Sequence, residues 1–580
     1  MRTLSDKIRL KISEVLHITS EGLLSIDDIY NQLVEPPNLE MGDMAFGCFA
    51  LAKLAKKSPA QIATDLKAKI PTDSAIESVA AAGPYLNFKL SANFIGEALL
   101  SEIATGAHFK KELTNQNPKT MVEFSQPNTH KELHVGHMRN TCLGDAVVRT
   151  LRYVGVSVIS TTFPGDVGTH VAKCLWYLKY KNQEAIPQTE KGEWLGRMYS
   201  KAHLKLEEEE SGPLAEQNKK QITEILKQLE SKSGEFYELW KETRAWSIEL
   251  MKQTYDWTEI SFDQWYWESE VDSPSVQYVK KLYDEGKLQK SEGAIGYDLN
   301  DENLGFCLLL KSDGTGLYAT KDIELARRKF QDYKIDKSIY VVDMRQALHF
   351  KQVFKVLEKI GFAQAKNCFH LQYNFVELPD GAMSSRKGNI VPLMQLVHQM
   401  EAMVKSQYLS KHESEWSKAE LDLVATQVAQ GAIKYGMVKI DNNKKIVFDM
   451  SEWLKIDGDS GPFIQYSAAR INSLCRKFEK NQLQNVKWSL LSHSSERGLM
   501  QAMMNFNTVT IQAAETLRPS ILCTYLFDLA KRFNFFYHEC TIGNAESEEL
   551  KQARLNLAYC TGEVLKTGLS LIGIPTPERM

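Results

Sequence analysis

The sequence lacks the features that mark several classes of protein. Its nine cysteines are scattered and form no CxxC pair, which argues against a disulfide framework and a structural zinc site and fits a reducing cytoplasm. No apolar run approaches the roughly 18 to 20 residues that span a bilayer. The first residues, MRTLSDKIRLKISEVL, lack the apolar core of a signal peptide. We therefore expect a cytoplasmic protein without a membrane partner.

A strong charge of one sign is also lacking, because the formal net charge is only −3. A nucleic-acid partner would then have to be bound by local basic patches, since the chain carries no global positive field. No internal repeat is present. With 580 residues the chain is longer than one domain usually is, and we expect three or four modules.

Composition and periodicity change along the chain. The first hundred or so residues predict a small α/β module, in which SPAQIATDLKAKI is typical of a serine-capped helix and AAGPYLNFKLS of a turn followed by a strand. The polar stretch HFKKELTNQNPKT then predicts a linker. From about Ile390 to the end, long segments of helical period dominate and strand signals nearly vanish.

The middle of the chain begins with the pattern of a parallel βαβ unit. TMVEFS predicts a strand, QPNTHKEL a loop, HVGHMRNTCLGDAVVRTLRYVG a helix that stops at Gly155, and VSVISTTF the next strand. Residues 179 to about 260 are charged and helical in period, which indicates an insertion. KSIYVVDM and CFHLQYNFVEL then return to a strand pattern.

Two histidines lie where the first helix of this unit begins. His134 and His137 are three residues apart with Gly136 between them, whereas a helical HExxH zinc site has a four-residue spacing and an intervening glutamate. Ligands of βαβ units sit beyond the strand ends, where a helix N-terminus favours phosphate. Gly136 would let a flat ring or a phosphate approach the backbone. The residues thus suggest a nucleotide-phosphate site, with two capping histidines as the alternative.

A second segment, MSSRKGN at 383–389, follows the last strand pattern of the same region. Its Arg386 and Lys387 could fold over a triphosphate and neutralise the leaving pyrophosphate. An exposed basic turn is the alternative. Together, HxGH after the first strand and this loop near the end of the region form a specific combination.

With these two segments the chain resembles the arginyl-tRNA synthetase family of class I aminoacyl-tRNA synthetases, which carries HxGH and a KMSKS-like loop. The resemblance covers nearly the whole chain. It extends over FSQPNTHKELHVGHMRNTCLGDAVVRTLRYVG, GTGLYATKDIELARRK, GDSGPFIQYSAARI and the ending VLKTGLSLIGIPTPERM.

The resemblance implies three domains. We expect an N-terminal tRNA-binding α/β domain at 1–110 and a Rossmann-type α/β catalytic domain at 118–390 with its helical insertion at about 179–260. A C-terminal all-α helical bundle at 391–580 would bind the anticodon. In that bundle, Tyr466, Phe535 and Tyr537 could stack on bases, although core packing is the alternative for each of them.

The resemblance also implies the reaction. Arginine attacks the α-phosphate of ATP to give arginyl-adenylate and pyrophosphate, and the 3′-terminal adenosine of tRNA(Arg) then takes the arginyl group and releases AMP. The first step in this family characteristically requires bound tRNA. We expect ATP as a substrate, an accompanying Mg²⁺, no metal held by protein ligands alone, and a monomer.

Five residues match positions that hold arginine in the family. A guanidinium pairs best with a carboxylate in fork geometry, and the candidates are Glu123 and Asp322. Tyr318 lies four residues before Asp322 and would share its helix face. Asn128 and Gln346 would hold the α-amino and carboxylate ends. An ion pair of Asp322 with Lys321 or Arg327 is the alternative.

The ATP site implied by the resemblance comprises His134, Gly136, His137, Met383, Ser384, Ser385 and Lys387, with the two histidines stabilising the adenylation transition state. The KMSKS frame is incomplete here, because Ala382 and Ser385 stand where the family pattern has lysines. The resemblance implies that a lysine three residues before HxGH replaces the second of them, which makes Lys131 a catalytic candidate with Lys387 assisting.

A second departure is DVGTH at 166–170, where the family usually has DWGTQ. Val167 cannot stack as tryptophan would. Three other hypotheses remain: a small nucleotidyltransferase, for which the chain is too long; a tRNA-binding relative without catalysis, which the retained site residues oppose; and a synthetase for another amino acid, which Asp322 opposes.

Overall fold

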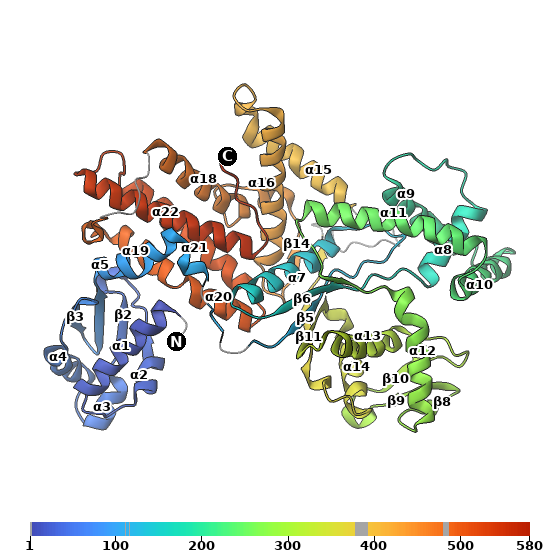
Figure 1. Ribbon diagram of the computed structural model, residues 1–580, viewed down its shortest axis with the longest axis horizontal. Helices are drawn as coiled ribbons and strands as arrows, with labels where there is room; N and C mark the ends of the chain where they lie inside the picture. Colours follow the sequence, from blue (N-terminus) through green and yellow to red (C-terminus); the bar gives the residue numbers. More distant parts are fainter. Residues whose placement is uncertain (1–2, 111, 115–116, 378–391, 479–485) are drawn as a thin grey trace. The chain divides into compact units, whose positions relative to one another are not determined.

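The computed structural model describes residues 3–110, 112–114, 117–377, 392–478 and 486–580, and the chain divides into two compact units (Figure 1). Unit 1 comprises residues 1–115, 153–155 and 454–580. Unit 2 comprises residues 116–152 and 156–453. Unit 2 contains the HxGH segment, whereas MSSRKGN lies outside the described residues.

A five-stranded parallel sheet forms the centre of unit 2, in the order β12-β11-β5-β6-β7. Its strands are β5 (Thr120–Glu123), β6 (Val158–Thr162), β7 (Gln264–Trp265), β11 (Lys337–Asp343) and β12 (Cys368–Tyr373). The first strand along the chain, β5, lies between β6 and β11, so the strand order reverses there. In doubly wound folds a ligand binds beyond the carboxyl ends of the strands at this reversal.

Helix α7 (Val135–Tyr153) follows β5, and most of its residues are buried. Gly144 allows this close packing, because a Cβ there would meet the Phe124 side chain at 2.1 Å. The same pattern of a strand, a loop and a buried helix was expected from the sequence. The helix begins one residue after His134, which places HxGH at the carboxyl end of β5.

Helices α8 to α14 lie between strands of the sheet along the chain, whereas α15 to α17 follow its last strand, β12. In Figure 1, α8 to α11 gather in one group, and α12 to α14 gather in another with an antiparallel sheet of order β10-β9-β8. The bounds in chain order are α8 (Thr169–Tyr180), α9 (Lys191–Glu208), α10 (Ala215–Ser231), α11 (Glu235–Trp257), α12 (Glu268–Asp284), β8 (Gln289–Ser291), β9 (Ala294–Asp298), β10 (Phe306–Leu310), α13 (Tyr318–Tyr333), α14 (Ala347–Lys359), β13 (Val376–Glu377), α15 (Leu393–Val404), α16 (Lys418–Val438), β14 (Ile446–Val447) and α17 (Met450–Leu454).

Unit 1 combines an antiparallel sheet of order β1-β2-β4-β3 with two sets of helices. The strands are β1 (Leu33–Val34), β2 (Met44–Gly47), β3 (Ile76–Ala82) and β4 (Tyr85–Leu90). The helices are α1 (Leu4–Thr19), α2 (Ile26–Gln32), α3 (Phe49–Ala55), α4 (Pro59–Lys69), α5 (Ala92–Ile95), α6 (Ser101–Thr105), α18 (Gly461–Lys477), α19 (Ser494–Met504), α20 (Phe506–Glu515), α21 (Ser520–Glu539) and α22 (Glu548–Leu571). Arg497 of α19 donates to the Asp43 carboxylate at 2.7 Å, which ties the C-terminal helices to the sheet.

The expected fold class is confirmed: an α/β Rossmann-type region with inserted helices, an N-terminal α/β region and a C-terminal helical region. The compact division differs from the expected start of the helical module at residue 391, because α15 and α16 belong to unit 2. The apolar period of a helix predicts that it packs against a core, but it does not predict which core.

Candidate active site

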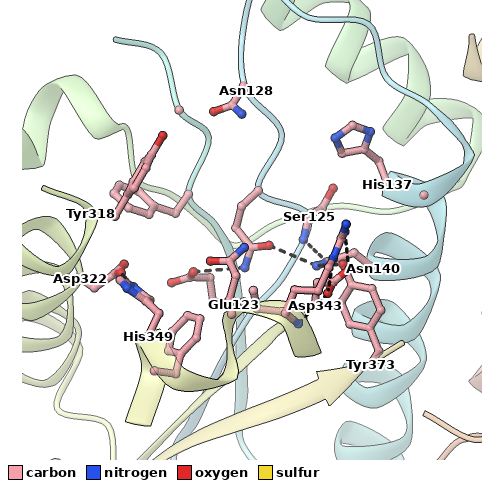
Figure 2. A pocket seen from close by; sticks show the side chains of 18 of the residues that line it. Glu123, Ser125, Asn128, His137, Asn140, Tyr318, Asp322, Asp343, His349 and Tyr373 are labelled. Atoms are coloured by element: carbon pink, nitrogen blue, oxygen red, sulfur yellow. Dashed lines mark hydrogen bonds and ion pairs between the residues drawn. The ribbon is translucent and has the colours of Figure 1, made fainter. Parts of the chain in front are cut away.

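A cavity of about 990 Å³ lies in unit 2 at the carboxyl ends of β5, β11 and β12 (Figure 2). This is the place where the strand order reverses. The cavity is lined by eight of the residues predicted to bind substrates, namely Glu123, Asn128, His134, Gly136, His137, Tyr318, Asp322 and Gln346. Figure 2 shows Asp322, Tyr318 and His349 on one side and His137 and Asn140 on the other. One cavity therefore brings together both sets of candidates.

Backbone hydrogen bonds fix the two histidines of HxGH in one tautomer. The N–H of Gly136 donates to Nδ1 of His134, and the N–H of His134 donates to Nδ1 of His137, each at 3.1 Å. A ring nitrogen that accepts a hydrogen bond carries no proton, so in each neutral ring the proton is on Nε2. The ring centroids are 4.0 Å apart. The pair thus has two Nε2–H donors on the cavity wall.

Both rings are neutral at physiological pH. Burial, assisted by the charge of Arg345, lowers the pKa of His134 to about 4. Burial also holds the pKa of His137 well below its usual value, and the charge of Lys131 acts in the same direction on both histidines. The two side chains are therefore suited to donating hydrogen bonds to phosphoryl oxygens, and they need not carry charge to do so.

The space beside Gly136 holds the ring of His134, whereas the sequence analysis expected a ligand ring or a phosphate there. A Cβ at this position would meet Cε1 and Nδ1 of His134 at 2.9 and 3.0 Å. The absence of a side chain therefore leaves room for the ring of His134 itself, which folds back over the backbone of residue 136. This glycine determines where the first imidazole of HxGH lies.

Glu123 is buried and already paired. Its carboxylate accepts hydrogen bonds from Nζ of Lys329 on α13 and from the side-chain amide of Gln126, the latter at 3.2 Å. Nζ of Lys329 also lies 3.9 Å from the ring centroid of Tyr340. The negative charge of Glu123 is thus offset within the protein by a fully buried cation.

Asp322 pairs with a residue that the sequence analysis did not consider. Its Oδ2 lies 2.5 Å from Nε2 of His349 on α14, and neither Lys321 nor Arg327 pairs with it among the ion pairs of the described residues. Lys321 contacts Glu268, while Arg327 contacts Glu324. The alternative ion pairs proposed for Asp322 are therefore wrong.

Asn128 is held at the cavity by the loop after β6. The backbone N–H of Thr129 donates to the carbonyl of Gly165 at 2.8 Å, and Asn128 forms a β-bridge with Gly165. A Cβ on Gly165 would meet Oδ1 of Asn128 at 2.4 Å and Oε2 of Glu268 at 3.0 Å. Gly165 therefore permits the amide and a second carboxylate to approach the same wall.

Several lining residues were missed by the sequence analysis. They are Ser125, Gln126, Asn140, Glu268, Lys321, Asp343, Arg345, His349 and Tyr373. The Asp343 carboxylate accepts hydrogen bonds from the side chain of Arg345 at 2.8 and 2.9 Å. A signal for Asp343, Arg345 and His349 was present, because VVDMRQALH places polar or charged residues at the end of a buried strand and just after it.

The two lysines predicted to assist catalysis, Lys131 and Lys387, are not found on the cavity wall among the described residues. Nζ of Lys131 lies 5.1 Å from the ring centroid of Tyr199, and Lys131 is not among the described residues that line the cavity. Lys387 lies outside the described residues, as do Met383, Ser384 and Ser385.

The DVGTH segment retains a clear structural role. The buried Asp166 carboxylate accepts hydrogen bonds from Arg244 at 2.7 Å and from the backbone and hydroxyl of Ser269 at 2.8 Å. Its carbonyl accepts from the indole of Trp240 at 2.7 Å. Val167 packs against the apolar cluster of α8, α10 and α11. Asp166 thus joins α11 and α12 to the loop after β6.

In unit 1, two of the three candidate aromatics for base stacking, Tyr466 and Tyr537, lie against one arginine. Tyr466 lies on α18, and Phe535 and Tyr537 lie on α21, where both are exposed. The guanidinium carbon of Arg470 lies 4.8 Å from the ring centroid of Tyr466 and 5.2 Å from that of Tyr537. Arg470, Tyr466 and Tyr537 thus combine a cation with two aromatic rings.

Within the described ranges, no group of three or more histidine, cysteine or acidic side chains is placed to hold a metal ion. The described helices likewise include none that is long and apolar enough to cross a membrane.

Three family models match the chain in succession. Residues 4–90 match the arginyl tRNA synthetase N terminal domain, residues 99–450 the catalytic domain of tRNA synthetases class I (R), and residues 464–580 the DALR anticodon binding domain. The resemblance stated from the sequence is confirmed.

Similar proteins and structures match over nearly their whole length. The arginine–tRNA ligase of Bdellovibrio bacteriovorus is 61% identical over 556 residues, which cover 96% of this chain and 95% of that protein. That of Clostridium perfringens is 35% identical over 560 residues, with 96% and 97% covered. The arginyl-tRNA synthetase structure from Thermus thermophilus matches with a TM-score of 0.79 and 28% identity over 99% of this chain and all of that one. The structure from Plasmodium falciparum, with a TM-score of 0.74, 22% identity and 98% and 99% covered, shows the shared fold.

Proposed function

The chain belongs to the arginyl-tRNA synthetase family, the arginine–tRNA ligases of class I, and we propose that it joins L-arginine to tRNA(Arg) through an arginyl-adenylate. The observation that carries this proposal is the shared cavity. It combines two neutral imidazole donors at a helix N-terminus with a carboxylate group suited to a guanidinium. ATP and arginine are the substrates that need both.

In the first step, a carboxylate oxygen of arginine attacks the α-phosphorus of ATP. A new P–O bond forms, the bond from the α-phosphorus to the bridging oxygen breaks, and pyrophosphate leaves with the electron pair. The Nε2–H groups of His134 and His137 donate hydrogen bonds to the α-phosphate oxygens, where charge builds. Removing one such donor typically costs about 10²–10³ in rate. Catalysis by positioning and electrostatics is sufficient, and no protein nucleophile is required.

In the second step, a hydroxyl of the 3′-terminal adenosine of tRNA attacks the carbonyl carbon of the adenylate. The ester bond forms, the anhydride bond between that carbonyl carbon and the phosphate oxygen breaks, and AMP leaves with the electron pair while the hydroxyl proton is released to the solvent. We place the anticodon end of the tRNA on the aromatic group around Arg470, because stacking on aromatics and contact with a cation are the usual means of holding unpaired bases.

For arginine itself, we assign Asp322 as the carboxylate that meets the guanidinium and Tyr318 as its neighbour on the same face of α13. Asn128 and Gln346 hold the two ends of the α-amino acid group. Glu123 also contributes to the arginine site, but its negative charge is already offset by Lys329. A buried site of this kind rejects an analogue that leaves its carboxylate unpaired.

The role of the missing KMSKS lysine goes to Lys131, with Lys387 assisting. The charge of Lys131 lowers the pKa of both HxGH histidines, which supports a place close to the phosphate site. Mg²⁺ enters as part of the MgATP substrate, held by the nucleotide phosphates. We further propose that the enzyme is a monomer, which light scattering after gel filtration would test.

The test is ATP–pyrophosphate exchange with purified protein, Mg²⁺ and each amino acid in turn, with and without total tRNA. We expect exchange with arginine only, and only when tRNA is present. Exchange with another amino acid would overturn the substrate assignment. Absence of exchange under every condition, with tRNA binding intact, would favour a tRNA-binding protein without catalysis.

A further inference from the structure

His349 lies against the carboxylate that we assign to arginine. It is in the first turn of α14, and its Nε2 is 2.5 Å from Oδ2 of Asp322 on α13. Both side chains line the cavity, and both are partly exposed to it, at 26% and 16%. Figure 2 shows the imidazole turned toward the carboxylate beside Tyr318. The contact joins two helices that are both needed to form the arginine end of the cavity.

We propose that His349 is the positioning residue for arginine recognition: its neutral imidazole orients Asp322 toward the guanidinium, and its protonated form competes with arginine for that carboxylate. This inference rests on the proposed function. A neutral ring with its proton on Nε2 donates one hydrogen bond to Oδ2 and leaves the charge of Asp322 free for a cation. An imidazolium at the same place would cancel that charge.

The surroundings of the pair leave His349 as the group that titrates. The other titratable groups nearby are His370 on β12, Tyr340 on β11, Glu123 on β5 with Lys329 on α13, and Asp343 at the end of β11 with Arg345. Burial raises the pKa of the Tyr340 phenol well above its usual value, so this group stays protonated. Glu123 and Asp343 are each held in an ion pair. His370 contacts the carbonyl of Val342 at 3.0 Å, and burial lowers its pKa. The phenol of Tyr318 stays protonated, because burial raises its pKa.

The direction of the effect follows from the charges. Burial lowers the pKa of His349, but the hydrogen bond and the charge of Asp322 outweigh burial, and the net shift is upward from its usual value. The free enzyme therefore holds a proton on His349 into the range above pH 6.5. Guanidinium binding at Asp322 removes the reason for that shift and adds a second cation, so arginine and the proton exclude each other. Raising the pH through this range should tighten arginine binding.

The experiment measures KM for arginine and kcat in tRNA-dependent exchange from pH 6 to 8 at saturating ATP. For the wild type, KM for arginine should fall by up to about tenfold for each unit of rising pH below the pKa of His349, and it should level off above that pKa. The value of kcat at saturating arginine should not show this pH dependence. His349→Gln keeps a neutral donor and cannot titrate, so its KM should be independent of pH over the same range. At each pH, the KM of the wild type is divided by the KM of His349→Gln. This ratio removes the effect of the titration of ATP and tRNA, which is the same for both enzymes.

Two further variants isolate the role of the contact. His349→Ala should raise KM for arginine about tenfold or more at pH 8, with little change in KM for ATP, and glutamine at this position should recover most of that loss. His370→Gln removes a neighbouring histidine that does not touch Asp322, and it should keep the pH dependence of the wild type. Circular dichroism checks that each variant is folded.

A His349→Gln enzyme that retains the full pH dependence would overturn the inference, as would a His349→Ala enzyme with an unchanged KM for arginine. These outcomes differ from failure of the proposed function, in which the wild type shows no arginine-dependent exchange at any pH.

Discussion

Gly136→Ala tests how the active histidines are held. The added Cβ would lie 2.9 Å from Cε1 and 3.0 Å from Nδ1 of His134, well inside the roughly 3.5–4.0 Å at which carbon atoms attract each other. The ring must therefore move by roughly half an ångström to one ångström, and the hydrogen bond from residue 136 to Nδ1 weakens. A displacement of this size can cost about 10²-fold in rate.

This loss should appear in kcat of arginine-dependent exchange and not in stability. Gly136 does not have a positive φ, and alanine is the better helix former by about 1 kcal/mol, so the variant should fold at least as well as the wild type. Gly212→Ala provides the control, since its Cβ would meet only the carbonyl of Glu209, at an ordinary 3.5 Å. Thermal unfolding and exchange rates would be measured for both variants.

A double-mutant cycle decides the cause. If the alanine acts by displacing the imidazole, it should cost nothing further once the imidazole is gone, so His134→Ala and His134→Ala/Gly136→Ala should have the same kcat. The coupling would then equal the effect of the single change, about 2.7 kcal/mol for a 10²-fold loss. Additive losses would refute the explanation, and a Gly136→Ala enzyme with normal kcat would show that the position of the ring does not matter.

Three further predictions concern buried charge and the phosphate site. Lys329→Met should destabilise unit 2 by about 3–5 kcal/mol, because it leaves the buried Glu123 carboxylate uncompensated. Urea unfolding followed by tryptophan fluorescence would measure this loss, and Glu123→Gln/Lys329→Met should recover most of it. A Lys329→Met variant as stable as the wild type would contradict the pairing. Burial lowers the pKa of His130 to about 3, so below pH 6.5 the unfolded chain binds a proton that the folded chain does not. The free energy of unfolding should therefore decrease by about 1.4 kcal/mol for each pH unit below 6.5 because of this group. His130→Gln should remove that part of the pH dependence of stability. Lys131→Ala should reduce exchange far more than Lys387→Ala, whereas equal small losses would contradict the role of Lys131.

Local features of the site could be predicted from the sequence because they depend on local spacing. The βαβ pattern placed HxGH at the start of α7, and the four-residue interval between Tyr318 and Asp322 placed both on one face of α13. In each case, neighbours along the chain are also neighbours in space. Residue type and period therefore placed each pair on its element, and the resemblance to the family supplied the expectation that both pairs belong to one site.

The partners of the charged groups could not be predicted in the same way. Lys329 lies 206 residues from Glu123, and His349 lies 27 residues from Asp322 on a different helix. The sequence suggested Lys321 and Arg327 for Asp322 because they are close along the chain, but both turn to other carboxylates. Such pairing depends on how helices cross the sheet, which periodicity does not specify.

These pairings explain why a site with two candidate carboxylates suits a substrate side chain with one positive charge. Glu123 and Lys329 form a neutral pair, and Asp322 with a neutral His349 leaves one negative charge at the end of the cavity. One guanidinium balances it. Two free carboxylates would repel each other and raise their own pKa values, and one of them would take up a proton in place of binding arginine. Lys329 prevents this by offsetting Glu123 from within the core. The charge left on Asp322 then depends on the proton of His349, and the affinity for arginine should follow that proton.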